Sequence, residues 1–368
     1  MVKVLTSPSR YVQGKDVLAE IGKYVKPLGD KALVVISKGG YSRNGQMVEK
    51  SFQEAGIEAV FEFFAGESSR DEVERLQKIV QEKGLNVSVG IGGGKALDTA
   101  KTVAHFESLP VAVCPTSAAT DAPCTSFSVM YTEDGEFDEY VFFDRTSDLI
   151  LMDTQVVANA PKRLFVAGMG DALATMFEAR ASVASGAKNL VGGLSTRAAL
   201  RLTELCYEIL MEEGRKALQA VEAGVLTEAV DQVIEASRYL SGVGAESSGL
   251  AAAHAVHNGM TALEETHAYL HGEKVAFGVI TQLVLENAPQ EELDEVLDFC
   301  MDIGLPVTLA ELGVKEPDEA GLRNVAELAV AEGDTGHNEP FAVDADMYYA
   351  AIVAADKIGT NARAKRNA

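Results

Sequence analysis

The sequence predicts a parallel α/β domain followed by an all-helical domain, and two patterns support this fold class. In the first half, short β-branched runs alternate with amphipathic stretches, as in a sheet with crossover helices. Beyond about residue 160 the strand pattern gives way to long Ala- and Leu-rich segments with charged faces. Pro161 interrupts the pattern within residues 158–163, so we place the domains at 1–160 and 161–368.

The strands and helices of the first half follow one another in a regular order. Apolar, β-branched runs of this length are typical of strands that are buried on both faces of a parallel sheet. Between two of them, residues 71–84 carry four apolar side chains on one helical stripe and end at Gly84, a frequent helix stop. In the second domain, residues 195–218 are a clear helical segment. The predicted strands are residues 32–37, 87–92, 111–116 and 149–154.

The composition favours an enzyme over several other classes of protein. A chain of 368 residues with 47% hydrophobic content can bury a large core and form two domains. A net charge of −23 argues against a nucleic-acid partner, which would need clustered Lys and Arg. Since no apolar run is long enough for a signal peptide or a membrane span, we expect a cytoplasmic protein with no membrane partner.

Four scattered cysteines are too few for a disulfide framework, and no CxxC pair occurs. We therefore interpret them as reduced structural thiols. They are Cys114, Cys124, Cys206 and Cys300.

A glycine-rich turn follows the strand at 87–92 and opens a helix near Lys95. This geometry directs backbone N–H groups and the positive helix end towards an anion. The turn is not a Walker A loop, because Val89 stands where the first glycine belongs and Ala96 follows the lysine. It also differs from the standard Rossmann fingerprint, whose last glycine is replaced by Lys95. A tight structural turn would explain the glycines, but the strand-to-helix context favours a pyrophosphate site.

A second polar loop, residues 115–131, follows the next strand and gathers hydroxyl groups around Asp121. Ligands of open α/β sheets bind beyond the carboxyl ends of the strands, so both loops should border one crevice. Ordinary turn chemistry also explains Ser, Thr and Asp in a loop. The interpretation of this loop as part of a ligand site rests on its expected position beside the glycine-rich turn.

The histidines cluster late in the chain, with four of six between residues 254 and 271. Asp171, His254 and His271 could supply three ligands to one divalent metal, and carboxylate with imidazole suits zinc. Three protein ligands would leave a position open for substrate. Spacing does not choose the ligands, because His257 lies three residues after His254 and His267 four before His271. The other two histidines, His105 and His337, are left as structural or unassigned.

Five motifs in the chain together resemble the glycerol dehydrogenases of the metal-dependent, "iron-containing" alcohol dehydrogenase superfamily. The resemblance also includes SPSRYVQGK at 7–15 and runs nearly end to end. It implies a dehydroquinate-synthase-like fold, with an N-terminal Rossmann-like parallel-sheet domain, a C-terminal helical domain and the active site in the cleft between them. The motifs are GGGKALDTAK, TDAPC, GDALATMFEAR, GLAAAHAVHNG and HGEKVAFG.

The resemblance implies that Asp171, His254 and His271 are the metal ligands. Relatives that use iron carry a further histidine one helical turn after the aspartate, where this chain has Thr175. The site therefore resembles the zinc version of the family. His257 and His267 then become residues that orient ligands or relay a proton.

The resemblance also implies the cofactor and substrate residues. Asp121 matches the residue that hydrogen-bonds a substrate hydroxyl, and the pyrophosphate would lie on Gly94, Lys95 and the start of the following helix. The residues that match the cofactor site are Ser37, Gly94, Lys95, Ala96, Leu97, Asp98, Thr116, Ser117, Ala118, Ala119, Thr125, Phe127 and Tyr131.

One departure from the family concerns the choice of cofactor. The first nucleotide-binding strand usually ends in an aspartate that binds the adenosine ribose and repels a 2′-phosphate, and here the aligned residue is Ser37. Lys38 and Arg43 are close in sequence and could meet a phosphate. We rank NAD first and expect NADP to be used as well.

The expected function is a zinc-dependent, reversible oxidation of glycerol and related vicinal diols to dihydroxyacetone, with hydride transfer to NAD+. The catalytic residues would be Asp121, Asp171, His254 and His271. The family implies a homo-oligomer, with an octamer as the expected assembly. The alternatives are a dehydroquinate-synthase-type lyase, a dehydrogenase for another small polyol or aldehyde, and a non-catalytic protein that has kept the fold. The lyase would need several Lys and Arg residues to bind its anionic, phosphate-bearing substrate, and the motifs contain few of them.

Overall fold

The computed structural model describes all 368 residues, which divide into two compact units. The first, called the sheet unit here, contains residues Thr6–Ala118 and Ala122–Pro161. The second, called the helical unit, contains Met1–Leu5, Ala119–Asp121 and Lys162–Ala368. Two short segments from the first half of the chain thus belong to the helical unit.

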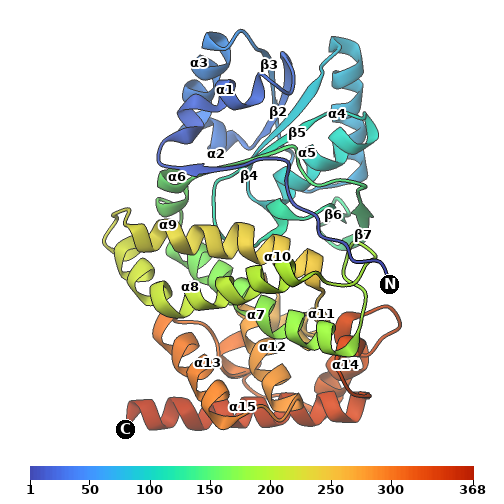
Figure 1. Cartoon of the computed structure of the whole chain (residues 1–368), viewed down its shortest axis with the longest axis vertical. Helices are drawn as coiled ribbons and strands as arrows, with labels where there is room; N and C mark the ends of the chain where they lie inside the picture. Colours follow the sequence, from blue (N-terminus) through green and yellow to red (C-terminus); the bar gives the residue numbers. More distant parts are fainter. The chain divides into compact units, whose positions relative to one another are not determined.

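A six-stranded, fully parallel sheet forms the centre of the sheet unit, with the strand order β1-β8-β5-β4-β2-β3 (Figure 1). The four predicted strands are confirmed. The two strands that the sequence did not predict are the edge strands, whose residues are only partly buried and therefore lack a continuous apolar run. The strands are β1 (Tyr11–Gly14), β2 (Lys31–Ile36), β3 (Glu58–Phe63), β4 (Val87–Gly92), β5 (Val111–Pro115) and β8 (Leu149–Asp153).

Helices cover both faces of this sheet because neighbouring strand residues point to opposite sides. On β2, Val34 and Ile36 pack with residues of α1 and α3, whereas Leu33 and Val35 pack with residues of α4 and α5. The predicted helix at 71–84 is confirmed as α4, which ends at Gly84 with a positive φ of 59°. The helices are α1 (Ile21–Val25), α2 (Lys38–Gly40), α3 (Gln46–Glu54), α4 (Arg70–Lys83), α5 (Gly94–Phe106) and α6 (Thr154–Ala158).

The segment 115–131, expected as one polar loop, was wrongly assigned in its last part. Residues Phe127–Tyr131 form strand β6, which pairs antiparallel with β7 (Phe137–Phe142). Every second residue of β6 is buried, which is the pattern of a half-exposed strand. Five residues of weak alternation directly after a Ser- and Thr-rich stretch gave too little periodic signal to separate the strand from the loop.

The sheet changes its winding direction between β2 and β4. From β2 the chain adds β3 on one side and then returns to add β4 on the other. Open α/β sheets bind nucleotides at the carboxyl ends of the strands beside such a reversal. Here those ends lead into Ser37 and into Gly93, which are the two turns that the sequence associated with a nucleotide.

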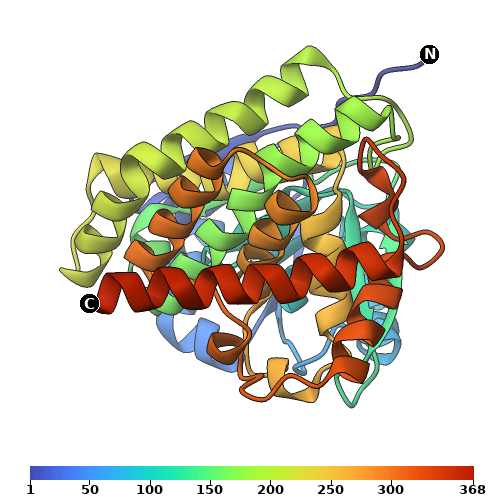
Figure 2. The ribbon, with the colours of Figure 1, turned by 90° about the horizontal axis from the view of Figure 1, so that it is seen from below.

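The helical unit has no named strand and only an isolated bridge between Lys3 and Leu194. The predicted helix at 195–218 is confirmed as part of α8, and the long C-terminal helix α15 lies across the unit against α12 and α14 (Figure 2). The helices are α7 (Lys162–Ser185), α8 (Arg197–Glu222), α9 (Glu228–Glu235), α10 (Ser241–Ser248), α11 (Ala252–Met260), α12 (His271–Leu285), α13 (Gln290–Ile303), α14 (Glu319–Ala329) and α15 (Ala345–Asn367).

Glycines let three of these helices approach one another at backbone distance. A Cβ atom on Gly272 of α12 would lie 1.8 Å from the carbonyl oxygen of Ala167 on α7. A Cβ on Gly170 of α7 would lie 2.4 Å from the carbonyl oxygen of Gly272. Further along α12, a Cβ on Gly278 would lie 2.3 Å from the carbonyl oxygen of Ala253 on α11. Any larger residue at these positions would push the helices apart.

No helix combines the length and the apolar content that a membrane crossing requires. All four cysteines are buried and none forms a disulfide, which agrees with their interpretation as structural thiols.

We predict that Gly272→Ala lowers the free energy of unfolding by about 1–3 kcal/mol, because the added methyl group forces α12 away from α7. Urea-induced unfolding measures this change. Gly321→Ala is the control, since a Cβ there meets only side-chain atoms, the nearest 3.1 Å away, and alanine favours the helix. Equal stability of the two variants would contradict this account of the helix contact.

Candidate active site

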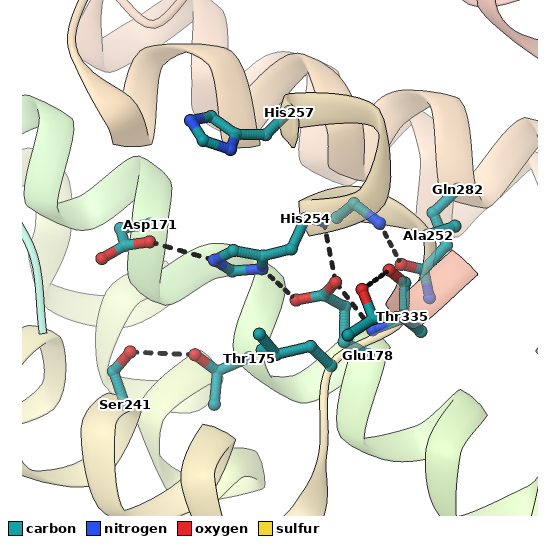
Figure 3. Close-up of polar contacts among 12 residues, drawn as sticks. Asp171, Thr175, Glu178, Ser241, Ala252, His254, His257, Gln282 and Thr335 are labelled. Atoms are coloured by element: carbon teal, nitrogen blue, oxygen red, sulfur yellow. Dashed lines mark hydrogen bonds and ion pairs between the residues drawn. The ribbon is translucent and has the colours of Figure 1, made fainter. Parts of the chain in front are cut away.

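Three helices of the helical unit bring Asp171, His254 and His271 together. Asp171 lies on α7, His254 in the first turn of α11, and His271 is the first residue of α12. The Oδ1 atom of Asp171 lies 3.0 Å from Nε2 of His271 and 3.6 Å from Nε2 of His254. Figure 3 shows the imidazole of His254 pointing towards the carboxylate of Asp171. The ligand atoms of all three side chains lie within 4.8 Å of one another.

This donor set fits a divalent metal ion. Two ligands at the usual zinc distances in a tetrahedron are about 3.3 Å apart, which is close to both separations from the Asp171 oxygen. The Asp171 side chain is 2% exposed, whereas those of His254 and His271 are 15% and 33% exposed. The cluster is therefore anchored in the core and open on its histidine side, as a site that receives a substrate needs to be.

The charges of Asp171 and the two histidines interact strongly. Burial alone would raise the pKa of Asp171, but His271 and His254 lower it well below its ordinary range. Burial likewise disfavours the charged form of His254, yet the carboxylates of Glu178 and Asp171 raise its pKa well above the ordinary value. The protein thus holds a carboxylate and an imidazole in mutual attraction at a site where a bound cation would replace the protons.

Asp121 belongs to the same cluster. Its backbone N–H donates to Oδ2 of Asp171 at 3.1 Å, and its own Oδ2 accepts a 2.6 Å hydrogen bond from Ser241. Burial and the repulsion by Asp171 raise the pKa of Asp121 to about 6. The hydroxyl of Ser241 also lies 2.9 Å from that of Thr175, one helical turn after Asp171 (Figure 3). Thr175 therefore contacts the residue that supports Asp121.

The remaining histidines fall into two groups. Nε2 of His257 lies 3.0 Å from Nδ1 of His271, so His257 contacts the ring nitrogen of His271 that does not face Asp171. Burial, then the charges of His271 and Lys274, lower the pKa of His257 well below its ordinary value. His267 precedes α12 in a turn, and its ring lies 2.9 Å from the carbonyl oxygen of Thr261. The four-residue spacing from His267 to His271 is thus not a helical pair.

The two distant histidines have local structural contacts. The ring of His105 packs 4.9 Å from that of Phe143, and His337 lies 2.8 Å from the carbonyl oxygen of Val330. Neither contact involves Asp171, His254 or His271.

Sequence reasoning missed Glu178. This residue is completely buried, and its Oε2 lies 2.6 Å from Nδ1 of His254. Asp171, Thr175 and Glu178 follow one another at helical spacing, so they share one face of α7. That spacing within GDALATMFEAR, together with an acidic residue in an Ala-rich helix, was the signal that could have drawn attention to it.

In the sheet unit, α5 starts at Gly94 directly after the glycine turn, close to the expected Lys95. The ammonium group of Lys95 pairs with Glu67 and lies 4.3 Å from the ring centre of Tyr131. Burial raises the pKa of Tyr131 to about 12. In the first turn of α5, the N–H groups of Ala96 and Leu97 donate to the carbonyl oxygen of Gly93. The N–H groups that precede them lie at the positive end of the helix next to a lysine, which is suitable for a phosphate.

Several other residues of the expected cofactor set have structural contacts. The carboxylate of Asp98 is buried, pairs with Lys101 at 3.1 Å and accepts from the backbone N–H of Val129 at 3.2 Å, which ties α5 to β6. The backbone N–H of Thr116 donates to Gly92. The hydroxyl of Thr125 donates to the carbonyl oxygen of Ala122.

The apolar residues of the expected cofactor set are mostly packed. Buried in the core are Ala96, Leu97 and Ala118. Phe127 packs against Tyr140 and Phe142. Ser117 is partly exposed, and Ala119 belongs to the helical unit.

Ser37 follows β2 and caps the next helical segment, since its side chain accepts a hydrogen bond from the backbone N–H of Gly40 at 3.0 Å. Lys38 and Arg43 are exposed and form no ion pair with a carboxylate. The guanidinium of Arg43 lies close to Gly39, because a Cβ there would be 3.3 Å from Nη1. Two unpaired cations thus lie beside Ser37.

Comparison with known proteins identifies the family of the chain. Residues 8–154 match the family of iron-containing alcohol dehydrogenases. The chain is 52% identical to a glycerol dehydrogenase of Escherichia coli over 98% of both chains. It is also 48% identical to a glycolaldehyde reductase of Halobacterium salinarum, over 99% of this chain and all of that protein.

The fold is also that of a solved relative. The crystal structure of glycerol dehydrogenase from Schizosaccharomyces pombe is 35% identical and covers 100% of this chain and 93% of its own, with a TM-score of 0.96. The predicted fold class, a parallel-sheet domain followed by a helical domain, is thereby confirmed. The chain belongs to the glycerol dehydrogenase group of the iron-containing alcohol dehydrogenase family.

Proposed function

We propose that the protein catalyses the zinc-dependent, reversible oxidation of glycerol and related vicinal diols, with transfer of hydride to NAD+. The observation that carries this proposal is the convergence of Asp171, His254 and His271 in a chain of this family. A divalent ion held by these three residues would polarise a substrate hydroxyl and lower its pKa. Oxidation at the secondary carbon of glycerol would yield dihydroxyacetone.

In this proposal Asp121 orients the substrate. Its carboxylate is held by Ser241 and its backbone by Asp171, so it is fixed within the cluster and can accept a hydrogen bond from a neighbouring hydroxyl of the diol. Fixing two adjacent hydroxyl groups aligns the carbon that loses hydride, and such orientation is a major part of catalysis. This arrangement favours diols over simple alcohols.

The donor set favours zinc over iron. Thr175 stands where iron-using relatives are expected to carry a histidine, and its hydroxyl is engaged with Ser241. Thr175 is 2% exposed, so its surroundings leave little room for a larger side chain. One carboxylate and two imidazoles with an open fourth position are typical of catalytic zinc.

For the nucleotide, we propose that the turn at Gly93 and the start of α5 bind the pyrophosphate and that Lys95 contributes a positive charge. Glu67 now pairs with this lysine and would share it with the phosphate. NAD is the first expectation, and the unpaired Lys38 and Arg43 beside Ser37 support the use of NADP as well.

A related candidate function is the reduction of a small hydroxyaldehyde. It is favoured by the glycolaldehyde reductase of Halobacterium salinarum, which is nearly as similar to this chain as the glycerol dehydrogenase. The same residues would act in the reverse direction, with Asp121 holding the hydroxyl next to the carbonyl. We do not retain the lyase, because the chain belongs to a family of dehydrogenases. A homo-oligomeric, cytoplasmic enzyme, with eight subunits as the first expectation, remains part of the proposal.

The proposed function is tested by stripping the protein with a chelator, reloading it with zinc or with iron, and measuring reduced-cofactor formation from glycerol with NAD and NADP in parallel. We expect zinc to restore the activity, since the donor set fits it. In the reverse assay, comparison of dihydroxyacetone with glycolaldehyde decides between the two candidate functions. A folded protein that is inactive in every metal state with these substrates would contradict both.

We predict that His271→Ala releases zinc and lowers turnover by more than the roughly 10–100-fold that loss of an outer-sphere partner produces, because a direct ligand is removed. His267→Ala is the matched control, since that histidine only contacts the Thr261 carbonyl in an exposed turn. Metal content and NADH titration measure the effect, and nucleotide binding should persist. Full activity of His271→Ala would refute the ligand assignment.

We predict that Ser37→Asp shifts the preference towards NAD, because a carboxylate at this position repels a 2′-phosphate while still capping the helix. The ratio of kcat/KM for NADP over that for NAD should fall about tenfold or more, the effect of about 1.4 kcal/mol. Ser37→Asn keeps the cap without the charge and should leave the ratio nearly unchanged. An overwhelming NAD preference in the unaltered protein would rule out the proposed phosphate contact.

A further inference from the structure

Glu178 is a buried carboxylate at the back of the metal cluster. Its side chain is completely buried, and its only ion-pair partner is His254. A buried acidic group is expensive to maintain unless hydrogen bonds satisfy both oxygens. The contacts of Glu178 therefore indicate what this acid does.

Three N–H groups donate to this carboxylate. The backbone N–H groups of Ala251 and His254 both donate to Oε1 at 2.9 Å. On the other oxygen, Oε2, the ring Nδ1 of His254 lies at 2.6 Å (Figure 3). One carboxylate thus holds both the backbone and the side chain of His254.

The start of α11 is held entirely by side chains from other parts of the chain. No local residue caps this helix. The N–H of Ala252 donates to Oε1 of Glu339 at 3.3 Å, and that of Ala253 donates to Oε1 of Gln282 at 3.1 Å. Together with Glu178, these acceptors satisfy the N–H groups that every helix start leaves unpaired. Two of the three acceptors are acidic, which suits the positive end of the helix.

The contact at Nδ1 decides which ring nitrogen of His254 is free to bind a metal. An ionised carboxylate only accepts hydrogen bonds, so Nδ1 of His254 donates to Glu178 and carries a proton. In the neutral ring, which is the form that binds a metal, the lone pair is therefore on Nε2. Nε2 is the atom that lies 3.6 Å from Asp171 Oδ1 in the cluster. The ring is thereby fixed in both orientation and tautomer.

We propose that Glu178 is a positioning residue of the metal centre, which holds His254 in the tautomer and direction needed for metal binding and strengthens its donor nitrogen. This inference rests on the proposed function, since it requires a metal at Asp171, His254 and His271. Outer-sphere carboxylates of this kind raise the basicity of the ligand histidine. The two histidines of the cluster are unequal in this respect, because the outer nitrogen of His271 contacts the imidazole of His257.

Glutamine cannot replace Glu178, although it has nearly the same shape. Its amide offers one acceptor oxygen and one donating NH2 group. In either orientation, the NH2 group would face at least one of the three N–H donors. Glu178→Gln therefore either loses the contact with Nδ1 of His254 or opens the start of α11.

Glu339→Gln is the matched control. Glu339 caps the same helix and is also buried: its Oε1 accepts the N–H of Ala252 at 3.3 Å, while its Oε2 accepts no hydrogen bond. Burial, then the charge of Glu286, raises the pKa of Glu339 to about 8. A glutamine at this position can keep its oxygen on Ala252. The control thus changes a buried carboxylate at the same helix start without changing a contact of His254.

The experiment measures the zinc affinity of the full-length apo-protein by competition with a chromophoric chelator, and records the visible absorption of the Co2+-loaded form. We expect Glu178→Gln to bind zinc about 10–100-fold more weakly than the wild type and to alter the cobalt spectrum. Glu339→Gln should keep both properties. Thermal unfolding of the metal-free proteins shows whether a loss of zinc affinity is accompanied by a loss of stability. Wild-type zinc affinity in Glu178→Gln, or the same loss in both variants, would overturn the proposal.

If Glu178→Gln does not fold, the pair Glu178→Asp and Glu339→Asp decides. Aspartate keeps a carboxyl group at either position, but at position 178 it withdraws this group from Nδ1 of His254, so only Glu178→Asp should lose zinc affinity. Wild-type zinc affinity in Glu178→Asp would overturn the inference about Glu178 and leave the proposed function standing. Failure of the wild type to bind zinc at all would instead overturn the metal site of the proposed function, and this inference with it.

Discussion

The close contact between α7 and α12 is the constraint on which the cluster of Asp171, His254 and His271 depends. Gly170 precedes Asp171 and Gly272 follows His271, and each glycine lies against the backbone of the other helix. Because no Cβ separates the two backbones, the neighbouring carboxylate and imidazole meet at 3.0 Å. Gly278 extends the same close packing to α11, which carries His254. Side-chain volume at three positions thus sets the size of the site.

The buried charges of the helical unit are organised around this contact. Asp171 faces the histidines from one side, and Glu178, on the same face of α7, holds His254 from the other. Ser241 links Thr175 to Asp121, so Asp121 is connected to the same helix. Such groups are costly to bury singly, but each is paired here, and this pairing explains why polar residues persist in an Ala-rich core.

In the sheet unit, the local sequence pattern was sufficient to predict the central strands but not the edge strands or the hairpin. Strands buried on both faces have continuous apolar runs, so β2, β4, β5 and β8 were predicted correctly. The edge strands β1 and β3 and the hairpin of β6 and β7 are partly exposed, and their mixed sequences carry a weaker signal. The same limit explains why Phe127–Tyr131 was taken for loop.

The sequence by itself determined the fold class, the order of the main strands and helices, and the residue types available for metal and nucleotide binding, because these follow from local periodicity and composition. Resemblance to a family, rather than spacing, selected Asp171, His254 and His271 among the candidates. Only the tertiary structure decided that His257 contacts His271 while His267 contacts Thr261, and that Glu178 holds His254. Those contacts join residues up to 76 positions apart, and a helix pattern carries no information about which distant helix it will meet.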